Sequence, residues 1–200
     1  MIRPIRIHNL GAARAVILHR PHPTVQNLTR QLTAIGLSVA QVWPECGPDV
    51  LAAEFVFFDA DMGHDEQFPW APGASPMPMI ALIGSEAPGR VEWALRAGAH
   101  AQLLKPVGDN GVYSSLLIAR DAFDAQAALA AEIADLRRRL DERRSVVRAV
   151  ALLVAMGRSE AEAYGQLRQM AMAWRVSFED AALRVVAQRD GGRDDDRNRG

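Results

Sequence analysis

The stretch ALRAGAHAQLLKPV, residues 94–107, contains the end of a helical pattern, a short apolar run and the only lysine of the chain. Gly98 is suited to end a helix, because glycine readily adopts the left-handed backbone conformation that follows a last helical turn. The apolar run from 101 to 104 then predicts a β-strand. Lys105 follows this strand and directly precedes Pro106, whereas every other basic residue apart from the histidines is arginine. The stretch therefore predicts a helix followed by a strand, with a cation at the carboxyl end of the strand.

Four further apolar runs precede this unit, and helical patterns alternate with them. The runs are AVILH (15–19), residues 39–42, EFVFFDAD (54–61) and MIALIG (79–84). Apolar residues at helical spacing lie between the first two runs, and Gly36 ends that pattern. Alternating strands and helices predict a parallel sheet with helices on both faces. A helix between the third and fourth runs is doubtful, because the loop 62–78 is rich in proline and glycine.

Composition limits the class of protein. The 200 residues carry a formal net charge of −1, which gives no overall sign of nucleic-acid or membrane binding. Cys46 is the only cysteine, so no internal disulfide can form, and we expect a cytoplasmic protein. No apolar run has the length of a membrane span. We expect no enzyme activity, metal or cofactor, because the sequence has no phosphate-binding glycine loop, and His19 and His22 have no evident third ligand beside them.

The chain changes character from about Tyr113, and it contains no proline after Pro106. One long helix is predicted, with an apolar stripe in steps of three and four that Arg143 interrupts. The stripe consists of Ile133, Leu136, Leu140, Val147, Val150 and Val154. Charged residues on both flanks favour a coiled coil of about three heptads, and hence a homodimer, with dimerisation through Ile133, Leu136, Leu140 and Val147. The alternative is a long helix that packs on its own domain.

Two shorter helices are predicted after the long one. Ser159 with Glu162, and Ser177 with Asp180, have the spacing of helix N-terminal caps. The apolar faces of both helices predict a three-helix unit together with the end of the long helix. The last residues are polar and contain glycine but no aromatic residue, which predicts disorder. The expected organisation is an α/β domain at 1–112, a coiled-coil helix at 113–142, a helical domain at 143–188 and a disordered tail at 189–200.

The first part resembles the receiver domain of two-component response regulators, over roughly residues 13–120. The stretch 94–107 is similar to the receiver segment that ends in a Lys-Pro pair, and FFDADM (57–62) is similar to the strand that carries the phosphoacceptor aspartate. The resemblance implies a flavodoxin-like parallel sheet with its site at the carboxyl ends of the strands. It places Asp59 in the phosphoacceptor position and Lys105 beside it.

Two parts of a receiver site are missing from this sequence. A receiver holds Mg²⁺ with acidic residues after its first strand, but His19 and Arg20 stand there. A receiver has a hydroxyl residue after its fourth strand, where this sequence has Ile83. We therefore expect a pseudo-receiver that is not phosphorylated and in which Lys105 pairs with Asp59. Lys105 as an exposed loop residue, and phosphorylation at Asp59, are the alternatives.

The second part resembles the ANTAR domain, an RNA-binding antitermination module, over residues 142–186. The core stretch of that family corresponds to 149–154, its alanine–aromatic pair ends at Tyr164, and its leucine–arginine step ends at Arg168. The usual lysine of the core stretch is replaced here by Val150, which removes one cation. The resemblance implies binding to RNA, for which arginine suits phosphate and aromatic rings suit unpaired bases.

The order of pseudo-receiver, coiled coil and ANTAR domain resembles that of the AmiR/NasR-type transcription antiterminators. This resemblance implies a dimer that binds leader-RNA stem-loops, with a ligand-sensing negative regulator protein as a partner of the pseudo-receiver. The candidate RNA-binding residues are Arg144, Arg148, Tyr164, Arg168 and Arg175. The arginines of the long helix, Arg144 and Arg148, can instead belong to the solvated flank of the coiled coil. Two other functions stay open, a phosphorylation-controlled response regulator that uses Asp59 and a protein-binding coiled-coil scaffold.

Overall fold

The computed structural model describes residues 10–197 and divides the chain into two compact units. The first unit ends at Ala127, and the second begins at Ala128. One helix, α3 (Val112–Val154), starts in the first unit and ends in the second. Each unit has its own hydrophobic core.

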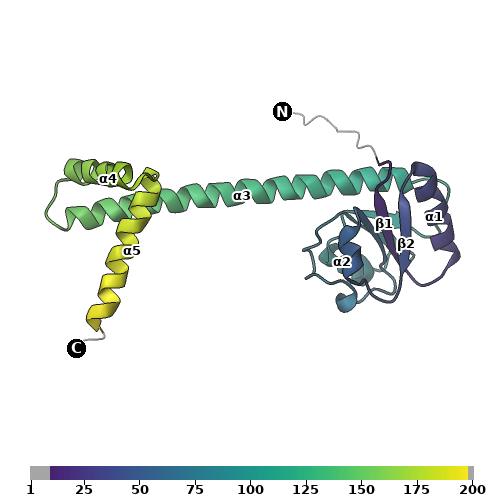
Figure 1. Ribbon diagram of the computed structural model, residues 1–200. Coiled ribbons are helices and arrows are strands. Elements are labelled where there is room, and N and C mark those ends of the chain that lie inside the picture. Colours follow the sequence, from purple (N-terminus) through teal and green to yellow (C-terminus); the bar gives the residue numbers. More distant parts are fainter. Residues whose placement is uncertain (1–9, 198–200) are drawn as a thin grey trace. The chain divides into compact units, whose positions relative to one another are not determined.

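The first unit contains a five-stranded, fully parallel sheet with the order β2-β1-β3-β4-β5. Figure 1 labels the neighbouring strands β1 and β2 of this sheet. The strands are β1 (Arg14–Leu18), β2 (Ser38–Val42), β3 (Phe55–Asp59), β4 (Met79–Ile83) and β5 (Ala101–Leu104). This order is that of the flavodoxin-like doubly wound fold, so the expected fold class is confirmed. In such a sheet the carboxyl ends of all strands lie along one edge, and the residues that follow β1, β3, β4 and β5 come together there.

The two faces of the sheet are covered differently. The helix α1 (Pro23–Ile35) and the first turns of α3 pack on one face, where Leu28 and Leu116 share a core cluster with Phe57. The helix α2 (Pro88–Ala97) packs on the other face, where Ala94 shares a cluster with Phe58. Successive side chains of a strand point to opposite faces, which explains why neighbours in β3 belong to different clusters.

The loop 62–78 contains no α-helix, as its proline- and glycine-rich sequence indicated. Between β3 and β4 the structure has only the 3₁₀ turn η2 (Asp65–Gln67), and between β2 and β3 only η1 (Pro48–Ala52). The loop covers the sheet with aromatic side chains instead. The Phe68 ring lies edge-on to Phe58 with centroids 5.5 Å apart, and Trp70 stacks on Phe68 at 5.5 Å.

The first unit extends further along the chain than the sequence indicated. Val112, Leu116 and Ala119 on α3 are buried in the core beneath the sheet. Leu116 and Ala119 therefore belong to the α/β domain, although the expected boundary at 112 assigned 113–142 to a dimerisation helix. The periodicity of one continuous helix contains no signal for the point at which it leaves the sheet.

The second unit consists of the end of α3, α4 (Glu160–Trp174) and α5 (Phe178–Arg197). A capping box at Ser159 and Glu162 begins α4, and the Ser177 hydroxyl accepts the Asp180 N–H at the start of α5. The three-helix arrangement agrees with the sequence-based expectation. The backbone of α5 is helical to Arg197, whereas the sequence predicted disorder from 189; residues 198–200 of that expected tail lie outside the described residues.

Candidate functional site

A buried ion pair lies at the carboxyl edge of the sheet. Asp59 ends β3 with 2% of its side chain exposed, and Lys105 follows β5 with 14% exposed. Lys105 Nζ donates to Asp59 Oδ1 at 2.7 Å. The pairing expected from the sequence is present, and the alternative of an exposed loop lysine is wrong. Because the pair is largely removed from water, its two charges depend on each other.

His19 occupies the place after β1 and closes the other side of Asp59. Its Nε2 lies 3.2 Å from Asp59 Oδ2 and 3.5 Å from Lys105 Nζ, and its Nδ1 donates to the Arg20 carbonyl at 2.6 Å. The His19 side chain is 2% exposed, whereas Arg20 is exposed. An imidazole supplies no oxygen ligand to a hard divalent cation, so the geometry does not favour Mg²⁺ beside Asp59.

A second carboxylate, Asp61, completes the cluster, and the sequence did not single it out. Asp61 Oδ2 lies 2.7 Å from Lys105 Nζ. Its carboxylate also accepts the Gly84 N–H at 2.8 Å and the Ser85 N–H at 3.0 Å. Burial raises the pKa of Asp61, but the hydrogen bonds from Lys105, Ser85 and Gly84 outweigh it, so the pKa lies below its ordinary value.

The end of β4 is shaped to receive this carboxylate. A Cβ atom added to Gly84 would lie 2.6 Å from Asp61 Oδ2, so a side chain there would displace the acid. Ile83, at the place of a hydroxyl residue in receivers, is 2% exposed and packs in the core. Ser85 contributes its backbone N–H rather than its hydroxyl to Asp61. The only sequence signal for Asp61 was its place two residues after Asp59.

These contacts form a closed cluster of one ammonium and two carboxylates, with an imidazole beside them. The cation and both backbone donors that an added anion would need are already bound to carboxylates of the chain. Among the residues that the structure describes, no three His, Cys, Asp or Glu side chains gather as a metal site. His19 and His22, the pair noted in the sequence, have ring centroids 5.6 Å apart.

The apolar stripe of α3 is exposed in the second unit. The exposed fractions are 40% for Ile133, 52% for Leu136, 57% for Leu140 and 65% for Val147, and Leu129 extends the stripe with 58%. Val150 is different, because it is 7% exposed and packs in the three-helix core. The expected stripe is therefore too long at its carboxyl end. The same apolar spacing leaves side chains exposed in one part of α3 and builds the three-helix core in the next.

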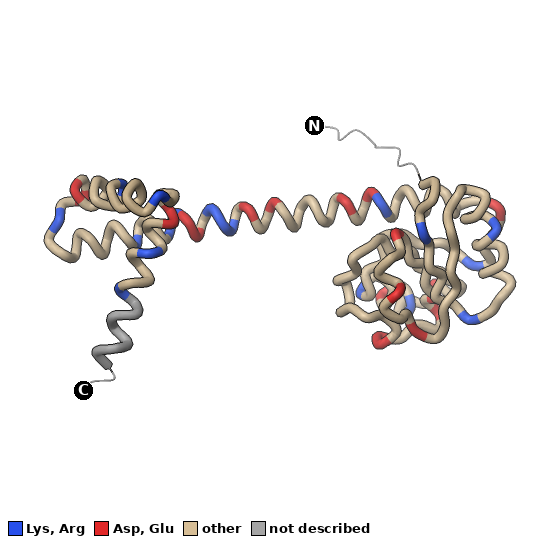
Figure 2. The backbone as a smooth tube through the Cα atoms, in the orientation of Figure 1, with Lys and Arg blue, Asp and Glu red and all other residues tan. Residues whose placement is uncertain are grey.

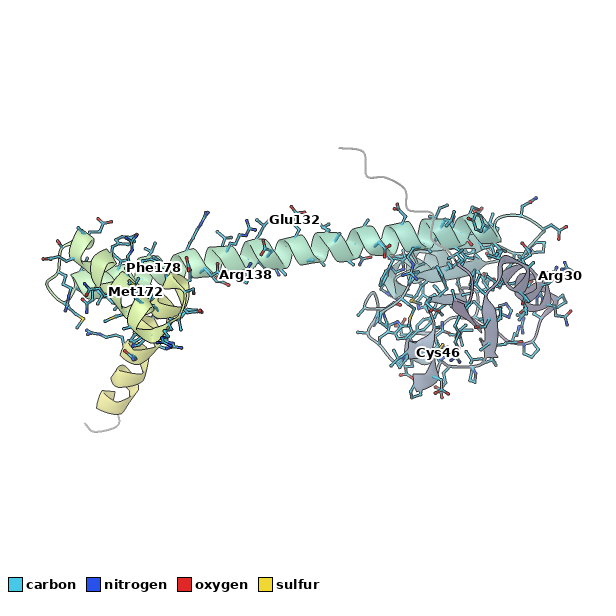
Figure 3. The ribbon with its side chains drawn as sticks, turned by 45° about the horizontal axis from the view of Figure 1, so that its top comes forward. Arg30, Cys46, Glu132, Arg138, Met172 and Phe178 are labelled. Atoms are coloured by element: carbon cyan, nitrogen blue, oxygen red, sulfur yellow. The ribbon has the colours of Figure 1, made fainter. Side chains whose placement is uncertain are left out.

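Acidic and basic residues are interspersed along the exposed part of α3 (Figure 2). Arg138 pairs with Asp135 one turn before it and with Glu142 one turn after it, and Figure 3 labels Arg138 on this part of the helix. Arg139 also pairs with Asp135, at 2.8 Å. Such exposed pairs within one helix each contribute little stability, and they are typical of the flanks of a coiled coil.

A cavity of about 440 Å³ opens on one side of α4 and the start of α5. Tyr164, Arg168 and Arg175, three of the expected RNA-binding residues, line it. Its remaining lining residues are Ala171, Met172, Val176 and Phe178. Arg168 is exposed and Tyr164 is 42% exposed. The spacing 164, 168 and 172 places these side chains on one face of α4, and Arg175 follows at the carboxyl end of the helix.

Two residues of this cavity were not found from the sequence. Met172 is 74% exposed, and Phe178 stacks on Tyr164 with ring centroids 6.1 Å apart and ring planes within 6°. Figure 3 labels Met172 and Phe178 in this unit. The start of α5 follows the turn after α4, and this turn brings the Phe178 ring next to the ring of Tyr164, which lies fourteen positions earlier in the sequence. The only sequence signal for Met172 is its place one helical turn after Arg168.

The other expected RNA-binding residues, Arg144 and Arg148, lie on α3 and do not line the cavity. Arg144 Nη1 lies 3.9 Å from Asp141 Oδ1. The position of the missing lysine, Val150, is buried in the core, so its change alters packing rather than the cavity surface. Trp174 is partly buried in the same core, with the Arg184 guanidinium 5.7 Å from its ring centroid.

Two protein-family models match this chain. The model of the AmiR N-terminal domain matches residues 13–120, more than half of the chain. The chain belongs to the AmiR family. A second model, that of the ANTAR domain, matches residues 134–186 and so begins on α3, earlier than the expected boundary at 143. The two domains together are those of an AmiR/NasR-type antiterminator, which is an RNA-binding antitermination regulator with a receiver-like N-terminal unit.

Solved structures match the chain at low identity. Full-length FixJ from B. japonicum is 18% identical, with a TM-score of 0.45, over 88% of this chain and 98% of that chain. The chemotaxis response regulator CheY4 of Vibrio cholerae is 15% identical, with a TM-score of 0.41, over 54% of this chain and 98% of that chain. No curated protein matches the chain. None of the helices within residues 10–197 combines the length and the apolar character of a membrane span.

Proposed function

We propose that this protein is a transcription antiterminator that binds leader-RNA stem-loops as a dimer. Its receiver-like unit is not phosphorylated and serves as a docking platform for a ligand-sensing regulator protein. The observation that carries the proposal is the cavity on α4, where two arginines and a tyrosine face solvent within the ANTAR domain.

The chemistry of that surface suits RNA. Arg168 and Arg175 supply planar cations that bind phosphate oxygens in pairs of hydrogen bonds and can stack on bases. Tyr164 supplies an exposed ring for an unpaired base. The lining of the cavity includes no acidic residue, so no fixed negative charge in it opposes the RNA backbone. Binding of this kind weakens steeply as salt rises, because counterions are released from the nucleic acid.

The exposed stripe of α3 supports dimer formation. Leu136, Leu140 and Val147 each expose more than half of their side chains at coiled-coil spacing. A second copy of the same helix would remove these side chains from water. Dimerisation joins two ANTAR domains, so binding of one stem-loop raises the effective concentration of the second domain at a neighbouring stem-loop.

The closed cluster of the receiver-like unit supports control by protein binding rather than by phosphorylation. Asp59 is held by Lys105 and His19, and Asp61 occupies the donors at the end of β4. A phosphodonor would have to break this cluster without a site for Mg²⁺. A partner that docks on the outside of the unit needs no such change.

Titration of a leader RNA with two stem-loops by the full-length protein tests the proposal. Fluorescence anisotropy at two salt concentrations should show binding that weakens with salt, and Arg168→Ala should weaken it further. Arg189→Ala is the matched control, because it also removes one exposed cation of the second unit but lies outside the cavity. A folded protein that binds no stem-loop would favour the protein-binding scaffold. Stable modification of Asp59 by acetyl phosphate would favour a phosphorylation-controlled regulator.

A further inference from the structure

A groove of about 940 Å³ lies between α3 and the start of α5, beside the exposed stripe of α3. The first turn of α5 lies next to α3 at this level (Figure 1). Leu183, which is 47% exposed, gives the groove an apolar patch. The groove therefore suits a side chain that combines a positive charge with an aliphatic stem. Its charged lining residues are Arg137, Arg138, Asp141, Glu142, Glu179 and Asp180.

The carboxylates of the groove exceed the cations that could balance them. Arg138 donates to Glu142 at 2.7 Å, so these two charges offset each other. Glu179 and Asp180, in the first turn of α5, take part in no ion pair within the described part of the chain. Arg137 is the other arginine of the lining. The groove thus keeps a negative charge toward solvent.

Arg143 is an exposed cation at the edge of the stripe that it interrupts. No hydrogen bond or ion pair joins it to another residue of the range 10–197. At about 100° per residue, Arg143 lies roughly 60° to one side of Leu140, whereas Arg137 and Asp141 lie roughly 60–100° to the other side. In a parallel coiled coil, opposite flanks of the two helices face each other. A second copy would therefore bring its own Arg143 to the flank that opens into the groove.

We propose that Arg143 of one chain inserts into the groove between α3 and α5 of a second copy, where it pairs with Asp141 and the carboxylates of Glu179 and Asp180. The contact occurs twice in a symmetric dimer. This inference rests on the dimer of the proposed function. It adds the start of α5 to the interface and gives the arginine that interrupts the stripe a partner.

The position of Arg143 favours a second copy over another occupant of the groove. Two α3 helices that meet along Leu136, Leu140 and Val147 place Arg143 at their interface, where a charge without a counter-charge is destabilising. The groove of the partner supplies that counter-charge. A metal ion alone is not favoured, because no three His, Cys, Asp or Glu side chains gather as a metal site in the part of the chain that the structure describes.

An exchange of charges in the full-length protein tests this contact. One variant carries Arg143→Glu, and a second variant carries Glu179→Arg together with Asp180→Arg. Each variant alone should form a dimer that dissociates roughly 5- to 30-fold more readily in sedimentation equilibrium, because both symmetric contacts then join like charges. An equimolar mixture should contain mainly heterodimers in native mass spectra, because each contact between the two variants again joins opposite charges.

Glu160→Arg is the matched control, because it reverses a charge in the first turn of α4, outside the groove. It reports the cost of removing an acidic residue from a helix start, and its dimer should be as stable as that of the wild type. Variant homodimers as stable as the wild type, or a mixture in which only the statistical half of the dimers are heterodimers, would overturn the inference alone. A wild type that stays monomeric would instead overturn the dimer of the proposed function.

Discussion

Replacement of Lys105 by methionine tests the closed cluster of the receiver-like unit. Methionine keeps most of the length and apolar volume of the side chain but removes the ammonium group. Asp59, 2% exposed, then loses the donor 2.7 Å from its Oδ1 and keeps only His19 and the Asp61 N–H near it. Removal of one partner of a buried ion pair typically costs about 3–5 kcal/mol, because the other charge stays buried without its partner. The lost contact between Lys105 and Asp61 costs less free energy, because Asp61 is 24% exposed and keeps the hydrogen bonds from its two backbone donors.

The free energy of unfolding can be measured by urea titration of the full-length protein with tryptophan fluorescence. Three of the four tryptophans, Trp43, Trp70 and Trp93, belong to the first unit, so the signal reports mainly on that unit. A loss of about 3 kcal/mol lowers the urea midpoint by roughly 1–3 M at the slopes usual for small domains. The double variant with Asp59→Asn removes both charges and should recover most of the loss.

A buried pair is refuted if Lys105→Met lowers the free energy of unfolding by less than about 1 kcal/mol, the range of exposed ion pairs. It is also refuted if Asp59→Asn adds its own loss to that of Lys105→Met, because two members of one cluster must be coupled. Either result would mean that Lys105 and Asp59 do not form a buried pair in solution.

Three further outcomes are expected. The double substitution Leu136→Asp and Leu140→Asp places charges in the exposed stripe of α3. It should convert a dimer to a monomer in sedimentation experiments, with the helix content retained. An unchanged mass would exclude this stripe as the dimer interface. Burial holds the pKa of His100 below the ordinary 6.5, and its Nδ1 accepts the Met79 N–H, so the unfolded chain binds a proton more readily than the folded protein. The free energy of unfolding should therefore fall as the pH drops below 6.5, and His100→Gln should reduce this dependence. Equal pH profiles of the two proteins would refute the assignment to His100. Acetyl phosphate with Mg²⁺ should leave Asp59 unmodified in mass spectra, and a stable adduct at that residue would contradict the closed cluster.

The fold was largely predictable because the relevant signals are local. Apolar runs, Gly36 and Gly98 fixed the strands and helix ends, and the proline- and glycine-rich loop correctly indicated that a helix was absent there. The pairing of Lys105 with Asp59 was also predictable, because parallel strands bring their carboxyl ends to one edge. These expectations depended on spacing along the chain and on general rules of sheet topology.

The residues that the sequence did not reveal act through contacts between distant segments. Asp61 gains its role from backbone N–H groups of Gly84 and Ser85, which carry no residue-specific signal. Phe178 joins Tyr164 only after α5 turns back from α4. The heptad pattern placed Val150 in the dimer stripe, although the three-helix core buries it, because both environments require apolar residues at the same spacing.

Transcription through the leader of a controlled operon tests the central claim most directly. In a purified transcription reaction, the account predicts that the full-length protein increases read-through of a leader terminator and that Arg168→Ala, folded and dimeric, does not. Addition of salt should reduce the effect in parallel with RNA binding. Termination that stays the same while the wild-type protein is bound to the stem-loops would contradict the account, because binding would then not lead to antitermination.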